Sequence, residues 1–139
     1  MRVLLVDENQ KTKETIAEEL KNSNKKFELI YANDGVEALG IIQEGKEVDL
    51  IVSDLQLPRM DGVTLLESLR ERKFVVSFII FSAEPPEKLV SISKSLQLNG
   101  WFPKSFNKSM SLDLDQLIKT LEKLSDKFLA LEKYEHIKE

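Results

Sequence analysis

Residues 48–62 read VDLIVSDLQLPRMDG. The segment Leu50–Ser53 is a largely apolar, β-branched run of strand length, which is typical of a strand buried on both faces of a parallel sheet. Asp54 follows this run directly, and Pro58 further along favours a turn. Asp61-Gly62 then has the pattern of a helix N-terminus, with Asp61 as the N-cap. The stretch therefore predicts a central strand, a loop that begins with a carboxylate, and a helix.

The same alternation of strand and helix extends over the whole chain. Four further strand-length runs are Val3–Val6, Phe27–Tyr31, Phe74–Phe81 and Trp101–Phe102. Apolar residues at helical spacing mark five helices, through Ile16 and Leu20, Val36 and Leu39, Val63 and Leu66, Leu89 and Ile92, and Leu114 and Leu117. Five strands alternating with five helices predict an α/β fold, in which one parallel sheet has helices on both faces.

Capping and turn residues predict where two of the helices begin or end. Asp34, with Glu37 three residues later, has the capping-box spacing for the start of the second helix. Pro85-Pro86 is expected to precede the fourth helix, and Asn99-Gly100 is expected to end it.

The composition excludes several classes of protein. A chain of 139 residues that is 42% apolar can form the core of one domain. The absence of cysteine excludes disulfide frameworks and thiolate metal sites, and it favours a reducing cytoplasm. The net charge of −4 gives no electrostatic reason to expect nucleic acid or anionic lipid as a partner. No apolar run approaches the roughly 20 residues of a membrane span, and the N-terminus lacks a signal-peptide pattern, so we expect a cytoplasmic protein.

Polar side chains are predicted to gather at one edge of the sheet. In an open parallel sheet, the functional crevice lies beyond the carboxyl ends of the strands. The residues predicted at these ends are Asp7-Glu8, Asp54, Ser82 and Lys104. Three carboxylates at one edge repel one another, so the cluster requires a compensating cation or raised pKa values.

The residue types at this edge point to one chemistry. Oxygen ligands without nearby histidine or cysteine suit Mg²⁺, while a lysine and a hydroxyl suit a phosphoryl group. An aspartate can itself be the nucleophile and form an aspartyl phosphate. The residues therefore predict Mg²⁺-assisted phosphoryl transfer to a carboxylate.

Residues 54–62, DLQLPRMDG, fit the pattern D-x-x-L-P-x-M-D-G, and residues 1–125 resemble the receiver domain of two-component response regulators. The resemblance implies a flavodoxin-like, doubly wound sheet with the strand order 2-1-3-4-5. It also implies that Asp54 accepts a phosphoryl group from a sensor histidine kinase or a phosphotransfer protein.

The resemblance further implies a role for each residue at the strand ends. Asp7, Glu8 and Asp54 would hold Mg²⁺, together with the backbone carbonyl of Gln56. Ser82 and Lys104 would contact the phosphoryl oxygens as members of the same catalytic site as Asp54.

One more position matches the family pattern. Trp101 stands where the family has its switch aromatic, whose rotamer follows the hydroxyl of Ser82. Gln56 and Glu84 border the site and are expected to set the lifetime of the phosphoryl group. Taken singly, some of these residues have simpler explanations, because a tryptophan at this place also suits core packing.

Three positions depart from the pattern. Glu8 replaces the more common aspartate, and Ser82 replaces the more common threonine. The dipeptide Lys104-Ser105 replaces the family's Lys-Pro, so the sequence does not require the cis bond that usually follows the lysine. Pro103 precedes the lysine instead, which an edge strand tolerates.

The resemblance leaves the C-terminus unexplained, so we assign residues 1–125 to the receiver domain and 126–139 to an extension of the last helix. A 3-4 apolar spacing runs through Leu114, Leu117, Leu121, Leu124, Phe128 and Leu131, and Glu135 breaks it. Either the helix simply projects, or its apolar stripe pairs with a second protomer or a target. His136 is expected to be solvated and not to carry a phosphoryl group.

These features predict a stand-alone response regulator receiver, too short after Leu124 to hold an output domain. It would be a phosphoacceptor switch that catalyses only its own phosphorylation and slow dephosphorylation, and would signal by protein–protein contact. The expected partners are the phosphodonor kinase or phosphotransfer protein, a downstream protein target, and a second copy bound through helix four, strand five and helix five or through the C-terminal helix. The alternative is a pseudo-receiver, a binding module that is not phosphorylated, which the Lys104-Ser105 corner favours.

Two enzyme classes fit poorly. A flavodoxin would have a Ser/Thr/Gly-rich phosphate loop after the first strand, where this chain has the acids Asp7 and Glu8. An aspartyl phosphatase would have a second aspartate two residues after the nucleophile, where this chain has Gln56.

Overall fold

The computed structural model describes residues 1–105 and 110–138, with side chains for residues 1–105 and 113–130. Its strands form one parallel sheet in the order β2-β1-β3-β4-β5. The strands are β1 (Arg2–Val6), β2 (Glu28–Ala32), β3 (Leu50–Ser53), β4 (Ser77–Ser82) and β5 (Gly100–Pro103). The helices are α1 (Gln10–Lys21), α2 (Gly35–Gln43), α3 (Gly62–Glu71), α4 (Leu89–Ser95) and α5 (Met110–Lys138). The predicted doubly wound α/β fold and its strand order are confirmed.

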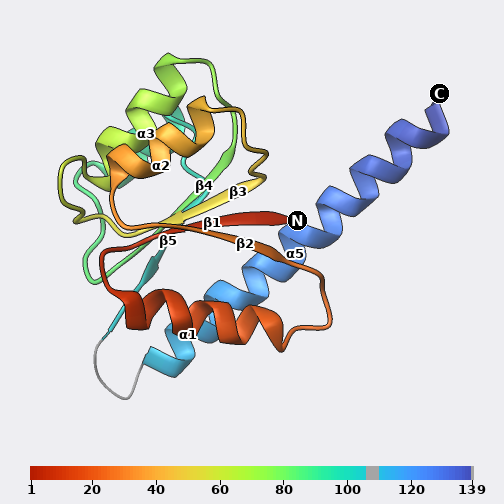
Figure 1. The fold of residues 1–139 in the computed structure, drawn as a ribbon, viewed down its shortest axis with the longest axis horizontal. Helices are drawn as coiled ribbons and strands as arrows, with labels where there is room; N and C mark the ends of the chain where they lie inside the picture. The colour runs from red at the N-terminus through yellow and green to blue at the C-terminus, as the bar shows by residue number, and fades with distance from the viewer. Residues whose placement is uncertain (106–109, 139) are drawn as a thin grey trace.

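The sheet separates two hydrophobic clusters. Helices α1 and α5 cover one face, and α2 and α3 cover the other (Figure 1). Along β1, Val3 and Leu5 belong to the cluster under α1 and α5, while Leu4 and Val6 belong to the opposite cluster, which the apolar residues of α4 also join. Because β1 and β3 are central and buried on both faces, nearly every position in them is apolar.

Side-chain caps fix the first turn of three helices. Asn9 Oδ1 accepts from the Thr12 backbone N–H at 3.1 Å, and Asp61 Oδ1 accepts from the Thr64 N–H at 2.8 Å. Asp34 caps α2 as predicted, through Glu37 N–H. Since α1 and α3 begin shortly after β1 and β3, these caps also fix the far ends of the loops that carry Asp7 and Asp54.

The fourth strand begins later than the predicted Phe74. The Phe74 N–H bonds to Leu69 O at 3.0 Å, and the Phe74 carbonyl accepts from Arg70 Nη1 at 2.8 Å. These bonds keep Phe74 in the turn that ends α3, so β4 starts at Ser77.

The prediction that Asn99-Gly100 ends the fourth helix is wrong. Helix α4 ends at Ser95, and Arg70 binds the carbonyls of Leu96 and Gln97 that follow. Asn99 instead pairs with Phe78 through both its backbone N–H and its side-chain oxygen, which leads the chain into β5.

Helix α5 is much longer than the sheet face that it covers. Its buried residues include Leu117 and Leu121, and Leu124 packs at the edge of the same cluster. A bond from Ser23 to Glu122 (2.6 Å) and an ion pair of Lys25 with Asp126 (2.8 Å) join α5 to the loop after α1. The helix then extends away from the sheet (Figure 1).

The side chains of Leu131, Glu135 and His136, which the sequence analysis singled out, lie outside the described part of the chain. None of the described helices is long and apolar enough to span a bilayer.

Candidate functional site

The sheet fixes the candidate site through its backbone. Asp54 directly follows β3, and its N–H bonds to Val6 O at 2.9 Å, which continues the pairing of β3 with β1. Lys104 directly follows β5, and its N–H bonds to Ser82 O at 2.8 Å. The absence of a proline after Lys104 therefore leaves its backbone anchored to β4, and no cis peptide bond occurs in the described chain.

Lys104 lies between two carboxylates. Its Nζ is 2.9 Å from Asp7 Oδ2 and 3.1 Å from Asp54 Oδ2. The side chains of Lys104 and Asp7 are 4% and 7% exposed, and that of Asp54 is 18% exposed. These three side chains carry one positive and two negative charges in a poorly hydrated place, which favours the binding of a further cation.

The predicted convergence of three carboxylates is met only in part. Glu8 is exposed, although it lines the same pocket as Asp7, Asp54 and Gln56. Among the described residues, no three acidic side chains are already gathered as a metal site. The oxygen donors around this pocket nevertheless fit Mg²⁺, since Asp7 and Asp54 present one oxygen each to the same ammonium and no softer ligand is part of the lining.

A second pocket shares Asp54, Gln56 and Lys104 with the first. Its lining includes Gln56, Ser82, Glu84 and Lys104. Asp54 Oδ1 accepts from the Leu55 backbone N–H at 2.7 Å, which fixes the orientation of the carboxylate between the two pockets. Asp54 and Lys104 thus line both an acidic pocket and a hydroxyl-bearing pocket.

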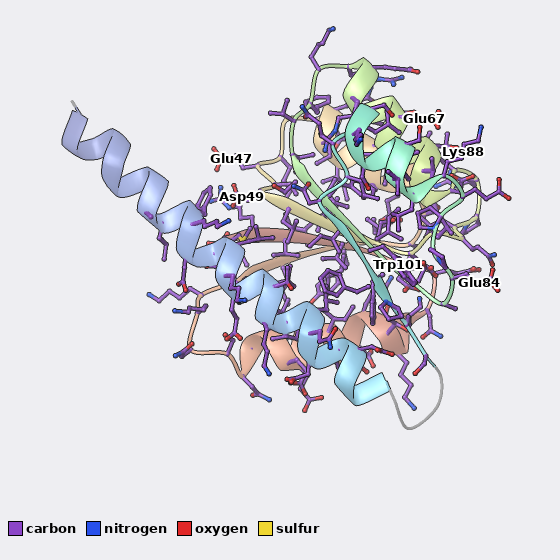
Figure 2. All side chains as sticks on the ribbon, turned by 180° about the vertical axis from the view of Figure 1, so that it is seen from behind. Glu47, Asp49, Glu67, Glu84, Lys88 and Trp101 are labelled. Carbon is purple, nitrogen blue, oxygen red and sulfur yellow. The ribbon has the colours of Figure 1, made fainter. Side chains whose placement is uncertain are left out.

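Ser82 and Trp101 are in direct contact. The Trp101 indole Nε1–H donates to Ser82 Oγ at 3.1 Å, and the Ser82 hydroxyl donates to the Glu84 carbonyl. Trp101 and Glu84 lie at the same end of the sheet (Figure 2). Both hydrogen bonds of the hydroxyl are therefore made within the protein, to groups beside the pocket.

Two features near the site were missed by the sequence analysis. Lys13 is buried on the inner face of α1 beside Asp7 and Asp54, and its amine donates to Asn33. The helical spacing that marked Ile16 also places Lys13 on that face, so the burial of Lys13 could have been predicted from the sequence. The ion pair of Arg59 with Asp34 had no such signal, because 25 residues separate the partners.

The chain matches the family model "Response regulator receiver domain" over residues 3–119. It belongs to the response regulator receiver domain family. Response regulator Rcp1 of Synechocystis is 27% identical over 128 residues, which cover 86% of this chain and 85% of Rcp1. The sensor kinase CckA of Brucella abortus is 37% identical over 97 residues, which cover 69% of this chain and 10% of CckA.

Solved receiver structures agree with the fold. The Francisella response regulator 1452 receiver domain gives a TM-score of 0.75 at 26% identity, with 91% of this chain and 98% of that one covered. The Mn²⁺-bound form of Rcp1 gives a TM-score of 0.73 at 26% identity, with 87% and 91% covered.

Several curated relatives are much longer than this receiver. The match spans 10% of CckA and 43% of the regulatory protein PhoP of Bacillus subtilis. Family membership therefore identifies the receiver and not the activity of these longer proteins.

Proposed function

We propose that this receiver is a Mg²⁺-dependent switch that is phosphorylated on Asp54. The observation that carries the proposal is the buried Lys104 ammonium held between Asp7 and Asp54, at the point where the two pockets meet. A receiver that had lost phosphoryl transfer would gain nothing from keeping two carboxylates buried around one lysine, because such a cluster is costly to desolvate.

The proposed reaction joins a carboxylate oxygen of Asp54 to the phosphorus of a phosphohistidine, while the phosphorus–nitrogen bond breaks and the histidine nitrogen takes up a proton. The Leu55 N–H holds the carboxylate in place, and the Lys104 ammonium lies beside it to neutralise the phosphoryl oxygens. Asp7, Glu8, Asp54 and the Gln56 carbonyl would hold Mg²⁺, which when bound neutralises charge on the phosphoryl group.

Ser82 would couple the reaction to the surface. To donate to a phosphoryl oxygen, its hydroxyl must release the Glu84 carbonyl, and its movement withdraws the acceptor of the Trp101 indole N–H. We infer that this rearrangement changes the surface formed by α4, β5 and α5 and is read by a protein target. Gln56 and Glu84, which line the pocket, would set how fast water removes the phosphoryl group.

The proposed partners are a histidine kinase or phosphotransfer protein as the phosphodonor and a downstream protein as the target. The likeness to a sensor kinase and to Rcp1, a response regulator of similar length, supports this assignment. Self-association through α4, β5 and α5 or through the end of α5 is a further proposal. Solution scattering with and without beryllofluoride tests it, and a monomeric mass in both states at high concentration would contradict it.

The decisive experiment uses acetyl phosphate as the phosphodonor. We expect intact-mass analysis to detect one added phosphoryl group in the presence of Mg²⁺, and Trp101 fluorescence to change on addition of beryllofluoride. Asp54→Asn is the matched control and should show neither effect. If Mg²⁺ and phosphodonor leave both mass and fluorescence unchanged in the unmodified chain, the pseudo-receiver becomes the better explanation.

A further inference from the structure

Outside the acidic pocket, one ion pair joins two loops at the same edge of the sheet. Arg59 lies in residues 54–61, here called the phosphoacceptor loop, and Asp34 is the N-cap of α2. The guanidinium donates to Asp34 Oδ2 through Nε at 3.0 Å and through Nη2 at 2.7 Å. Asp34 Oδ1 accepts from the Glu37 backbone N–H at 2.8 Å. A single carboxylate therefore holds both the start of a helix and the middle of the phosphoacceptor loop.

The backbone of Arg59 is held in an unfavourable conformation. Its φ of 65° lies in the left-handed region, which costs a residue with a Cβ roughly 1 kcal/mol or more. Such a conformation persists only where the surroundings impose it. Here the side chain of Arg59 is held by Asp34, and the Met60 N–H bonds to Pro58 O across Arg59 at 2.7 Å.

The loop also touches α2 through its backbone. A Cβ added to Gly35, the first residue of α2, would lie 2.3 Å from Met60 O. Only glycine allows this approach, so the first turn of α2 and the phosphoacceptor loop form one contact around the Asp34–Arg59 pair.

Asp34 depends on Arg59 for its charge balance. The Asp34 side chain is 11% exposed, whereas that of Arg59 is 60% exposed. Burial by itself raises the pKa of Asp34, but the hydrogen bonds from the Glu37 backbone and from Arg59 outweigh burial and lower this pKa. Asp34 is thus a charged group at pH 7 that uses Arg59 as its counter-ion.

The rest of the loop leads directly to the candidate site. Gln56 lines both pockets that Asp54 lines. The loop is closed by a bond from the Gly62 N–H to Leu55 O at 2.8 Å, and a Cβ at Gly62 would lie 2.5 Å from Asp54 O. Because this loop is short and closed, we expect a displacement at Arg59 to displace the backbone at Gln56 as well.

We propose that Asp34 and Arg59 form a latch that holds the phosphoacceptor loop in the conformation that binds a divalent cation. Both are positioning residues, since they act through the loop and lie outside both pocket linings. The inference rests on the proposed function. It makes that function depend also on the loop between β2 and α2.

The test compares Asp34→Asn and Arg59→Ala in the full chain. Asparagine preserves a good N-cap for α2, so Asp34→Asn removes the charge of the pair while the helix start is kept. We expect each substitution to weaken Mg²⁺ binding about threefold to tenfold, somewhat less than the roughly tenfold to hundredfold effect of losing a direct partner of a metal ligand. The double variant should bind Mg²⁺ no more weakly than the single variant with the lower affinity. Either single substitution already breaks the Asp34–Arg59 contact, so the second has no further contact to remove.

The sign of the Arg59 effect separates the latch from simple electrostatics. Removing a positive charge near an acidic site strengthens cation binding, and removing a negative charge weakens it. Electrostatics alone therefore predicts opposite changes for Arg59→Ala and Asp34→Asn, whereas the latch predicts that both weaken binding. Opposite signs, additive losses, or affinities within twofold of the unmodified chain would overturn the latch.

Mg²⁺ affinity is measured by calorimetry at constant ionic strength, and the rate of phosphorylation by acetyl phosphate is followed in parallel. Glu28→Gln is the matched control, because it breaks an exposed Arg–carboxylate pair and should leave both quantities unchanged. Urea unfolding shows whether each variant remains folded at the assay temperature. If the unmodified chain does not bind Mg²⁺, the proposed function itself is overturned. If all variants bind Mg²⁺ as the unmodified chain does, only the latch is overturned.

Discussion

Each end of the sheet holds one basic side chain between two carboxylates, but in opposite surroundings. At the carboxyl end, Lys104 binds Asp7 and Asp54 and is 4% exposed. At the amino end, Arg2 binds Glu28 and Glu47, and these side chains are 40%, 72% and 78% exposed. Glu47 lies at the end opposite to Trp101 and Glu84 (Figure 2).

Burial decides what the two groups of charges can do. Around Arg2, water and salt screen the charges, so the pairs add little to stability even though the Glu28 hydrogen bond raises the pKa of Arg2. Around Lys104, little water remains to stabilise the surplus negative charge. The surroundings of the buried group therefore favour the binding of a further cation, and those of the exposed group do not.

The largest effect is expected from Lys104→Met, which keeps the length of the side chain but removes its charge. Asp7 and Asp54 then lose the ammonium that pairs with both of them, and we expect the free energy of unfolding to fall by about 3 kcal/mol. Urea unfolding in the absence of divalent ions measures this loss. Unchanged stability would mean that the buried group is hydrated like the exposed one.

Mg²⁺ is expected to stabilise the chain through the buried group only. At a hundredfold excess over its Kd, a ligand of the folded state adds about 2.7 kcal/mol. This gain should disappear in Asp7→Asn and persist in Glu28→Gln, as measured by urea unfolding with and without Mg²⁺. Equal stabilisation of Asp7→Asn would place the cation elsewhere.

A smaller, pH-dependent effect is expected from Asp34→Asn. Since the pKa of Asp34 is lowered in the folded state, its contribution is complete above its unfolded pKa of about 3.9 and is lost as pH falls through the folded value. We expect the variant to be about 1 kcal/mol less stable at pH 7 and to lose less stability between pH 5 and pH 3. Parallel acid profiles for the two proteins would argue against the lowered pKa.

The smallest effect is expected from Arg2→Met, the counterpart of Lys104→Met at the exposed end. Its urea midpoint should match that of the unmodified chain within experimental error at 150 mM salt. A clear loss of stability there would show that burial is not what separates the two ends.

The elements that could be predicted from the sequence are those with short-range signals. Leu50–Ser53 is recognisable as a central strand because both of its faces are buried, and its bounds agree with the structure. Asp54 and Lys104 could be placed together because the carboxyl ends of parallel strands meet at one edge of the sheet.

The features that were missed depend on contacts between distant residues. The Arg70 guanidinium donates hydrogen bonds to the carbonyls of Phe74 and Leu96. With these carbonyls bound, β4 begins after Phe74 and α4 ends before Leu96. Nothing local to Asn99 shows that its amide oxygen accepts from the Phe78 N–H. The exposure of Glu8 could not be predicted either, because side-chain direction after a strand depends on the whole pocket.

The hydrogen bond from Trp101 to Ser82 has a spectroscopic consequence. Trp101 is the only tryptophan in the chain, so a ¹⁵N-labelled sample gives a single indole resonance in a proton–nitrogen correlation spectrum. That proton is the one donated to Ser82 Oγ. The chemical shift of one isolated peak thus reports whether the hydroxyl beside the phosphoacceptor is bound to the indole, without any substitution or attached probe at the site.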